Sequence, residues 1–426
     1  MIKIYKYPAK KKWSAIIQRP VADSSMLKKK VERIIAGVKG KGDEAIRKYT
    51  NQFDGVMLKK IAVTQKEIDN ASSLVPVELK QAIQLAKKNI EKFHTAQKED
   101  TNKIDTLPGV VCWRESQGIE KIGLYIPGGS APLFSTVLML AVPAQIAGCK
   151  EIVLCTPPAK DGSINAAILY TAALCGVTKI FKVGGVQAIA AMAYGTKTIP
   201  KVFKLFGPGN QFVTLAKQIV QQEAVAIDMP AGPSEVLVIA DKTCVPAFVA
   251  ADLLSQAEHG ADSQVILLTP DEEIAKLVLK EIEIQLLKLP RKEIAQKALT
   301  NSKIIITKNI DEAIEISNLY APEHLILSCA NAAVVSQKVM AAGSVFIGNY
   351  SPESAGDYAS GTNHTLPTNG YAAMYSGVSL DSFVKKITYQ QLTKEGLKNI
   401  GDAVMIMAEA EGLTAHKNAV SLRLKK

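Results

Sequence analysis

From residue 122 onward, short apolar segments that favour strands alternate with apolar segments that favour helices, and this limits the fold more than any other feature. Strands that are apolar on both faces and joined by helices form parallel sheets covered on both sides. The alternation therefore predicts a doubly wound, mainly parallel α/β sheet. The expected strands are residues 122–129, 151–158, 179–185 and 202–209, and the expected helices are residues 135–148, 164–176, 186–196 and 210–220.

The same alternation resumes after residue 247 and predicts a second α/β sheet. At 426 residues the chain exceeds the size that one hydrophobic core usually serves, so two or more domains are expected. Residues 235–241 are one more expected strand at the end of the first series. The strands expected after it are residues 263–269, 303–307, 324–328 and 344–348, with one helix ending near residue 259 and others near 271–288 and 311–319.

The N-terminal hundred residues are helical in pattern, because apolar residues recur with a 3.6-residue period around Val31 and again around Ile83. We expect these helices to pack on the second sheet. His94 closes the second helix in a polar stretch, HTAQKED, and is expected to lie on the surface. Further helices are expected from about residue 382 to the end.

The composition is that of a soluble globular enzyme, with 47% apolar and 21% charged residues. The six cysteines form no CxxC pair, so we expect buried thiols in a reducing cytoplasm. No signal-peptide core or membrane-length apolar run is visible. The net charge of +11 includes two lysine runs without interleaved aromatic residues. We therefore expect a cytoplasmic protein with neither a nucleic-acid nor a membrane partner.

Glycine-rich turns follow three expected strands of the first sheet, at residues 127–130, 183–187 and 207–210. Each leads into a helix whose first N–H groups and positive dipole end suit an anionic group. None matches the dinucleotide fingerprint G-x-G-x-x-G, since Phe212 stands where the third glycine would be. The turns are equally compatible with a phosphate-bearing ligand and with tight connections that need glycine.

Four of the five histidines lie in short clusters with acids or amides, which points to one assembled site. Imidazole is the commonest protein metal ligand and titrates near neutrality. Gln256 and His259 are spaced i, i+3 at a helix end, so both can face one ion, although an ordinary capped helix end also explains them. Glu323 and His324 are adjacent in PEHL and form a weak acid/base candidate.

Two further segments complete this pattern. Asp357 lies in a loop rich in glycine and serine that is able to reach over a pocket, and His364 follows it with either a structural or a functional role. Glu411 and His416 lie near the C-terminus, one and a half helical turns apart.

Together, these segments resemble the motif series of the histidinol dehydrogenase family. The matching motifs follow in the family's order across essentially the whole chain: GLYIPGG, KVGGVQAIAAMAYGT, FGPGNQFV, AGPSEVLVIAD, DLLSQAEHG, APEHL, GDYASGTNHTLPT and EGLTAHKNAVSLR. The resemblance implies a four-electron alcohol dehydrogenase that oxidises L-histidinol to L-histidine, the final steps of histidine biosynthesis. Two hydrides would pass to NAD through bound L-histidinaldehyde.

The resemblance also implies a role for each matching residue. Zn²⁺, one per subunit, is expected to hold the substrate, and NAD to accept the hydrides. His324 is expected to act as the base, and Glu323 to activate the water that hydrates the aldehyde. The implied zinc ligands are Gln256, His259, Asp357 and His416; the implied substrate contacts are Ser234, Gln256, His259, His324, Asp357, Glu411 and His416; and the implied NAD contacts are Tyr125, Gln187 and Asn210.

The implied organisation is two Rossmann-like α/β domains with small N- and C-terminal helical extensions. Residues 1–21 form an N-terminal arm, residues 22–123 and 235–377 the domain with the metal and catalytic residues, and residues 124–234 the NAD-binding domain. Residues 378–426 are expected to complete the neighbour's active site in an intertwined homodimer, and symmetric dimers are the commonest oligomers.

Two other classes of function are compatible with parts of the pattern. A zinc hydrolase would use similar ligands with Glu323 as base and would not depend on NAD, but its H-E-x-x-H signature is absent. An inactive binding protein on the same scaffold would have lost Glu323, His324 or a ligand, and this chain keeps them all.

Overall fold

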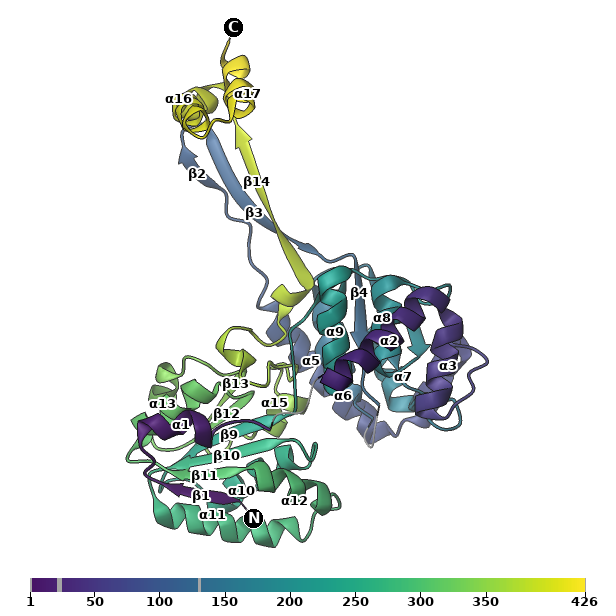
Figure 1. Cartoon of the computed structure of the whole chain (residues 1–426), viewed down its shortest axis with the longest axis vertical. Coiled ribbons are helices and arrows are strands. Elements are labelled where there is room, and N and C mark those ends of the chain that lie inside the picture. The colour runs from purple at the N-terminus through teal and green to yellow at the C-terminus, as the bar shows by residue number, and fades with distance from the viewer. Residues whose placement is uncertain (1, 21–24, 129–131, 426) are drawn as a thin grey trace.

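The structure is a computed structural model that describes residues 2–20, 25–128 and 132–425. In these ranges the chain forms a five-stranded and a six-stranded parallel sheet, each covered by helices, and a three-stranded antiparallel sheet. Figure 1 shows the antiparallel sheet extending away from the other two as a long arm. The predicted α/β class with mainly parallel sheets is confirmed.

The five-stranded sheet has the strand order β6-β5-β4-β7-β8. This is a doubly wound arrangement, with the change of direction between β4 and β7. The short strand β8 was not expected from the sequence. The strands are β4 (Lys121–Tyr125), β5 (Glu151–Thr156), β6 (Lys179–Lys182), β7 (Lys204–Phe206) and β8 (Ala226–Ile227), and the helices after the first four are α6 (Phe134–Ile146), α7 (Ala166–Leu174), α8 (Gly185–Tyr194) and α9 (Gln211–Glu223).

The N-terminal helices pack on this five-stranded sheet, so the prediction that they cover the second sheet is wrong. Val31 and Ile35 share a buried core with the α8 residue Ile189. Ile83 and Ile90 share another with the α6 residue Leu138. Their apolar periodicity identified a buried face but carried no information about its partner. These helices are α2 (Ser25–Lys41), α3 (Asp43–Asp54), α4 (Gln65–Leu74) and α5 (Val77–Thr95).

His94 is fully buried, which corrects its predicted surface position. Its Nδ1 lies 3.2 Å from Oε1 of Gln97, and the same oxygen accepts a hydrogen bond from the backbone N–H of Leu380 at 2.9 Å. The later chain therefore covers the polar end of α5, a contact that the local sequence does not reveal.

The six-stranded sheet has the order β1-β11-β10-β9-β12-β13, and the N-terminal arm supplies its edge strand β1. Apart from that added edge, it repeats the strand order of the first sheet. The strands are β1 (Lys3–Lys6), β9 (Glu235–Ala240), β10 (Gln264–Thr269), β11 (Lys303–Ile306), β12 (His324–Ser328) and β13 (Ser344–Ile347). The helices of this part are α1 (Trp13–Ile16), α10 (Pro246–Ala257), α11 (Glu272–Leu286), α12 (Lys292–Asn301), α13 (Ile310–Tyr320), α14 (Ala332–Val335) and α15 (Glu353–Tyr358). Of these, α1, α12, α14 and α15 were not expected, and α15 places Asp357 in a short helix where a loop was predicted.

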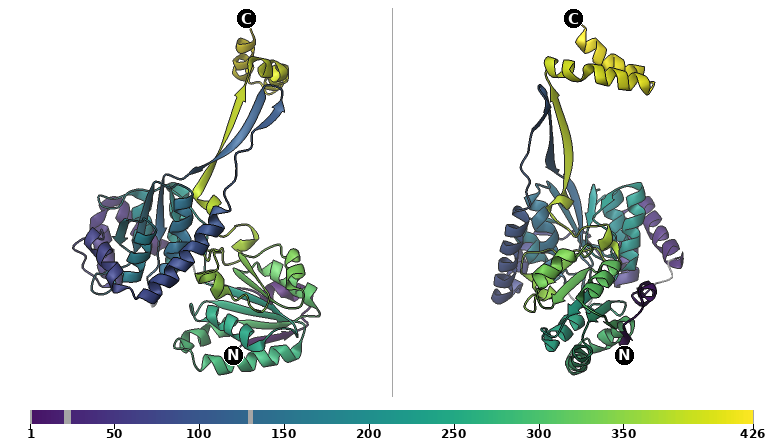
Figure 2. Two further views of the ribbon diagram at one scale, coloured as in Figure 1. Left: turned by 180° about the vertical axis from the view of Figure 1, so that it is seen from behind. Right: turned by 90° about the vertical axis from the view of Figure 1, so that its left-hand side faces the viewer.

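The long arm formed by the antiparallel sheet brings together segments that lie far apart in the sequence. β14 (Val384–Leu392) pairs antiparallel with β3 (Val110–Gly118), which also pairs with β2 (Ile104–Leu107). The C-terminal segment therefore begins with a strand, not a helix as predicted. Two helices follow, α16 (Lys394–Ala410) and α17 (Thr414–Leu424), and all views place them at the far end of the arm (Figures 1 and 2).

None of the helices within the described ranges is both long and apolar enough to cross a membrane. Short 3₁₀ turns complete the secondary structure at Lys10–Lys12, Ser336–Lys338, Tyr371–Ala373 and Leu380–Phe383.

Candidate active site

The candidate catalytic pair, Glu323 and His324, lies at the amino edge of the six-stranded sheet. Glu235 and His324 are the first residues of β9 and β12, which are neighbours in the sheet, and Glu323 immediately precedes His324. Ligands of doubly wound sheets usually bind at the carboxyl ends of the strands. The pair therefore uses the opposite edge.

The backbone of Glu235 holds both members of this pair. Nδ1 of His324 lies 3.0 Å from the carbonyl oxygen of Glu235, and because a carbonyl only accepts hydrogen bonds, Nδ1 carries the proton. The N–H of Glu235 donates to Oε2 of Glu323 at 2.8 Å. His324 Nε2 then faces Asp357, whose Oδ1 lies 3.5 Å away. The imidazole is thus fixed in orientation, with Nε2 on the side of Asp357.

The electrostatics of the pair are strongly coupled. Burial lowers the pKa of His324, which is 3% exposed, but the negative charges of Glu323 and Asp357 outweigh it and hold this pKa well above its ordinary value. Burial raises the pKa of Asp357, but the adjacent, positively charged His324 lowers it further than burial raises it. The charges of His364 and His259 lower it by smaller amounts.

The structure brings three of the four predicted metal ligands to one region. Gln256 is buried in the last turn of α10, His259 follows on the exposed side, and Asp357 lies in α15. Gln256 Oε1 and His324 Nε2 are buried and have no hydrogen-bond partner among the described residues. An unpaired carboxamide oxygen and an unpaired imidazole nitrogen beside a carboxylate fit a polar ligand, or a cation once the imidazole is neutral.

A set of three or more His, Cys, Asp or Glu side chains arranged to hold a metal does not occur in the described ranges. The predicted ligand set is compatible with this finding, because from these three positions it draws only His259 and Asp357 of those residue types. Its remaining members are the carboxamide of Gln256 and the distant His416.

His416 and Glu411 are not part of this region in the single chain. His416 lies in α17 and Glu411 directly follows α16, so both sit at the far end of the arm, and both are exposed. Ser234, by contrast, immediately precedes Glu235 and is half-buried at the amino edge of β9.

Glu353 is a site residue that the sequence did not reveal. It lies at the start of α15 and is 1% exposed, and one oxygen accepts a hydrogen bond from the hydroxyl of Ser255. Burial raises its pKa to about 7. Its Oε2 has no partner among the described residues. The sequence does not reveal Glu353 as a site residue, because its carboxyl becomes buried beside Ser255 and Gln256 only when α15 packs against α10.

His364 links the two parallel-sheet domains. Its Nδ1 lies 2.8 Å from the carbonyl oxygen of Asp357, and its Nε2 lies 3.1 Å from the hydroxyl of Thr136 in α6. The neighbouring Asn363 donates to the carbonyl of Met139 at 2.6 Å. Since α6 follows the carboxyl end of β4, this edge of the five-stranded sheet meets the amino edge of the six-stranded sheet.

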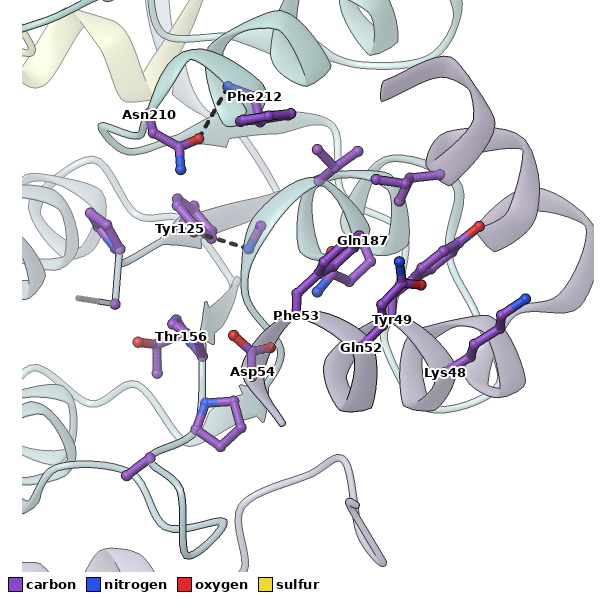
Figure 3. A pocket seen from close by; sticks show the side chains of 18 of the residues that line it. Lys48, Tyr49, Gln52, Phe53, Asp54, Tyr125, Thr156, Gln187, Asn210 and Phe212 are labelled. Carbon is purple, nitrogen blue, oxygen red and sulfur yellow. Dashed lines mark hydrogen bonds between the residues drawn. The ribbon is translucent and has the colours of Figure 1, made fainter. Parts of the chain in front are cut away.

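A pocket of about 1130 Å³ lies at the carboxyl ends of the five-stranded sheet. All three predicted NAD contacts, Tyr125, Gln187 and Asn210, line it (Figure 3). The Tyr125 hydroxyl accepts from the N–H of Gly185 at 3.0 Å, and Asn210 Oδ1 caps α9 by accepting from Phe212 and Val213. The turn at residues 127–130 lies partly outside the described residues; its Gly128 lines the pocket.

The pocket contains two buried acceptor atoms and a basic margin. Gln187 Oε1 and Asp54 Oδ2 have no hydrogen-bond partner among the described residues, so the pocket suits a ligand with hydroxyl or amide donors. Asp54 comes from the end of α3, which the sequence did not connect with this sheet. The basic side chains that line the pocket are Lys30, Arg33, Lys48 and Lys160, which suit a phosphate-bearing ligand.

Comparison with known proteins gives consistent matches along the chain. A family model described as histidinol dehydrogenase matches residues 17–424. Histidinol dehydrogenase of Bacteroides thetaiotaomicron is 60% identical over 424 residues, covering 100% of this chain and 99% of the relative. That of Escherichia coli K12 is 54% identical, covering 96% and 94%. A crystal structure of histidinol dehydrogenase from Elizabethkingia anophelis matches with a TM-score of 0.97 and 61% identity, covering 99% and 98%.

Proposed function

Because the chain belongs to the histidinol dehydrogenase family, we propose that it oxidises L-histidinol to L-histidine in two NAD-dependent hydride transfers. Bound L-histidinaldehyde would be the intermediate, and the reaction would be the last stage of histidine biosynthesis. The observation that carries this proposal is the fixed pair at the amino edge of β9 and β12, where His324 and Glu323 share the peptide groups of Glu235. The six cysteines are free, which suits the reducing cytoplasm.

His324 is the proposed proton acceptor. An alcohol must lose its O–H proton as the hydride leaves, and an imidazole is suited to accept it. The Glu235 carbonyl holds the proton on Nδ1, which leaves Nε2 to accept the substrate proton. Proton acceptance requires the neutral imidazole. Coordination of Asp357 by a cation would reduce its stabilisation of the imidazolium, and so lower the raised pKa of His324.

Glu323 is the proposed activator of water in the second half of the reaction. The aldehyde must gain water before the second hydride leaves, because the water supplies the second oxygen of the acid, while the hydride is the hydrogen already on the aldehyde carbon. The N–H of Glu235 fixes one oxygen of Glu323. The carboxylate is then able to accept a proton from water, while His324 serves both oxidations.

Gln256, His259 and Asp357 are the proposed zinc ligands of this chain, one ion per subunit. A donor set of imidazole, carboxylate and carboxamide is chemically suitable for zinc, and the unpaired Gln256 Oε1 fits a cation. Bound zinc would orient the substrate and polarise its reacting oxygen. Ser234 and His324 border the same region and are proposed substrate contacts.

NAD is the proposed occupant of the pocket at the five-stranded sheet. Tyr125, Gln187 and Asn210 would contact it, and the basic margin would receive its pyrophosphate. The contact between His364 and Thr136 brings this domain against the catalytic one, so a nicotinamide reaching past α6 would approach the substrate.

The arm suggests how the site is completed. Glu411 and His416 are exposed at its far end, while their proposed partners lie in the six-stranded domain. We propose an intertwined homodimer in which the arm of each chain delivers His416 as the fourth zinc ligand and Glu411 as a substrate contact to its neighbour.

The purified protein, supplied with L-histidinol, NAD and zinc, should form two NADH for each histidine, without free aldehyde accumulating. This follows from a base and a water-activating residue side by side at positions 323 and 324. Absorbance of NADH and chromatographic quantification of histidine in the same reaction provide the measurement. One NADH per substrate, with aldehyde released, would contradict the proposed role of Glu323, and turnover without NAD would favour a hydrolase.

Removing the metal with a chelator should abolish turnover while the fold persists. The two parallel-sheet domains have extensive apolar cores of their own, unlike a small zinc-dependent module that unfolds without its ion. Circular dichroism before and after chelation, followed by readdition of zinc, measures both effects. A cooperative loss of helical signal on chelation would show that the ion is structural.

A further inference from the structure

We propose that Arg19, in the N-terminal arm, is a positioning residue that aligns the catalytic pair Glu323 and His324 through Glu235. This inference rests on the function proposed above and adds a residue outside the site itself. Arg19 lies just after α1, 304 positions before Glu323, and touches neither member of the pair.

Arg19 donates two hydrogen bonds to the carboxylate of Glu235. Its Nε donates to Oε1 at 2.5 Å and its Nη2 to Oε2 at 2.8 Å. The guanidinium also stacks over the ring of Tyr320, 3.8 Å from its centre, and donates to the Tyr320 carbonyl at 2.7 Å. Both side chains of the ion pair are largely buried, at 18% and 3% exposed. Such a planar, bidentate pair fixes orientation as well as distance.

The backbone of Glu235 holds both members of the catalytic pair, so their positions depend on the position of Glu235. Its N–H holds the Glu323 carboxylate at 2.8 Å and its C=O holds the His324 Nδ1–H at 3.0 Å. These two peptide groups flank the α-carbon of Glu235, and the side chain on that α-carbon accepts the hydrogen bonds from Arg19. Rotation of Glu235 would therefore misdirect the base and the water-activating carboxylate together.

The same carboxylate also fixes the loop on the other side of the site. The N–H of Asn369 donates to Glu235 Oε1 at 2.9 Å, and Asn369 has a left-handed backbone with φ of 56°. The hydroxyl of Thr368 accepts from the N–H of Gly232. This loop continues from His364, so Glu235 connects three elements of the site: β9, β12 and the loop at residues 363–370.

Loss of Arg19 would leave the Glu235 carboxylate buried without its cation. An uncompensated buried charge is costly, so the carboxylate would take up a proton or turn toward solvent. Either change weakens the contact with Asn369 and loosens the peptide groups that orient His324 and Glu323. The side chains proposed to bind zinc and NAD do not contact Arg19, so the main effect should fall on the chemical steps.

Arg19→Ala is expected to lower kcat for L-histidinol on the order of 10²-fold while the KM values for L-histidinol and NAD change less than threefold. Misplaced catalytic groups typically cause losses of this size. Free guanidinium at low concentration should restore part of the activity, and Arg19→Lys should retain an intermediate kcat with one hydrogen bond instead of two. Lys10→Ala is the matched control, because Lys10 also lies in the N-terminal arm and forms an exposed 2.6 Å ion pair with Glu315. This variant should keep wild-type kcat.

A spectroscopic measurement separates this proposal from the function itself. With only five histidines in the chain, ¹⁵N imidazole spectra can be assigned by comparison with His324→Ala. Arg19→Ala should shift the Nδ1 resonance of His324 and Lys10→Ala should not, whether or not histidinol is the substrate. Wild-type turnover of histidinol tests the function independently.

The proposal is overturned if Arg19→Ala keeps both kcat and the His324 resonance. It is also overturned if activity falls only in proportion to the folded fraction and guanidinium restores nothing. If Arg19→Ala does not fold, Arg19→Lys decides: an unchanged kcat and His324 resonance in that variant would contradict the need for the bidentate pair.

Discussion

Replacing His324 with alanine should lower the rates of alcohol and aldehyde oxidation alike, by about 10²–10⁴-fold, the usual range for loss of a general base. Both oxidations need a proton acceptor, and the proposed Nε2 acceptor is held toward Asp357 by the bond from Nδ1 to the Glu235 carbonyl. Stopped-flow measurements of NADH formation, started from histidinol and separately from histidinaldehyde, resolve the two halves.

Glu323→Gln is the companion variant. It keeps the volume of the side chain and an oxygen able to accept from the N–H of Glu235, but removes the carboxylate that accepts a proton from water. The loss should therefore be concentrated in the step from aldehyde to acid. Equal slowing of both halves would show that the two residues do not divide the labour in this way.

Mixing two inactive single variants should restore activity if the sites are shared between chains. His259→Ala and His416→Ala each remove one proposed zinc ligand, and each homodimer should be essentially inactive. In a heterodimer, one site carries both lesions and the other carries neither. The heterodimer should therefore regain about half the activity of an intact dimer.

Affinity tags on the two variants allow the heterodimer to be purified and assayed after subunit exchange. His259→Ala mixed with Asp357→Ala is the matched control. Both of these residues lie in the same domain, so each site of that heterodimer keeps one lesion and activity should not return. If verified His259→Ala/His416→Ala heterodimers are inactive, the ligands do not come from two chains.

Much of the parallel-sheet architecture could be predicted because its signal is local. Strands such as β9 and β12 are buried along their whole length, and buried parallel strands produce uninterrupted apolar runs. The arm could not be predicted in the same way. All four residues of β2 are exposed, so burial imposed no apolar pattern, and β3 pairs with a strand more than 250 residues away.

The candidate site was predictable only in part for a related reason. Gln256, His324 and Asp357 have side chains of the kinds that bind metals or transfer protons, and the structure places them in one region. The proposed role of Arg19 and the burial of Glu353 both depend on contacts between distant segments. An isolated arginine in QRP or a glutamate in SPESAG has no distinguishing pattern, and the burial of Glu353 becomes visible only after α15 folds over α10.

The length of the paired strands β3 and β14 sets how far α16 and α17 lie from the parallel-sheet domains. β3 and β14 are joined over nine residue pairs, from Val384 and Gly118 to Leu392 and Val110, which corresponds to roughly 30 Å at about 3.4 Å per residue. Side chains alternate between the two faces, so removing one residue from each strand would turn every later side chain to the opposite face. Removing two from each would keep the faces and draw α16 and α17 inward by roughly 7 Å. The reach of the C-terminal helices is therefore adjustable only in matched two-residue steps, which constrains how far the length of either strand can drift independently of the other.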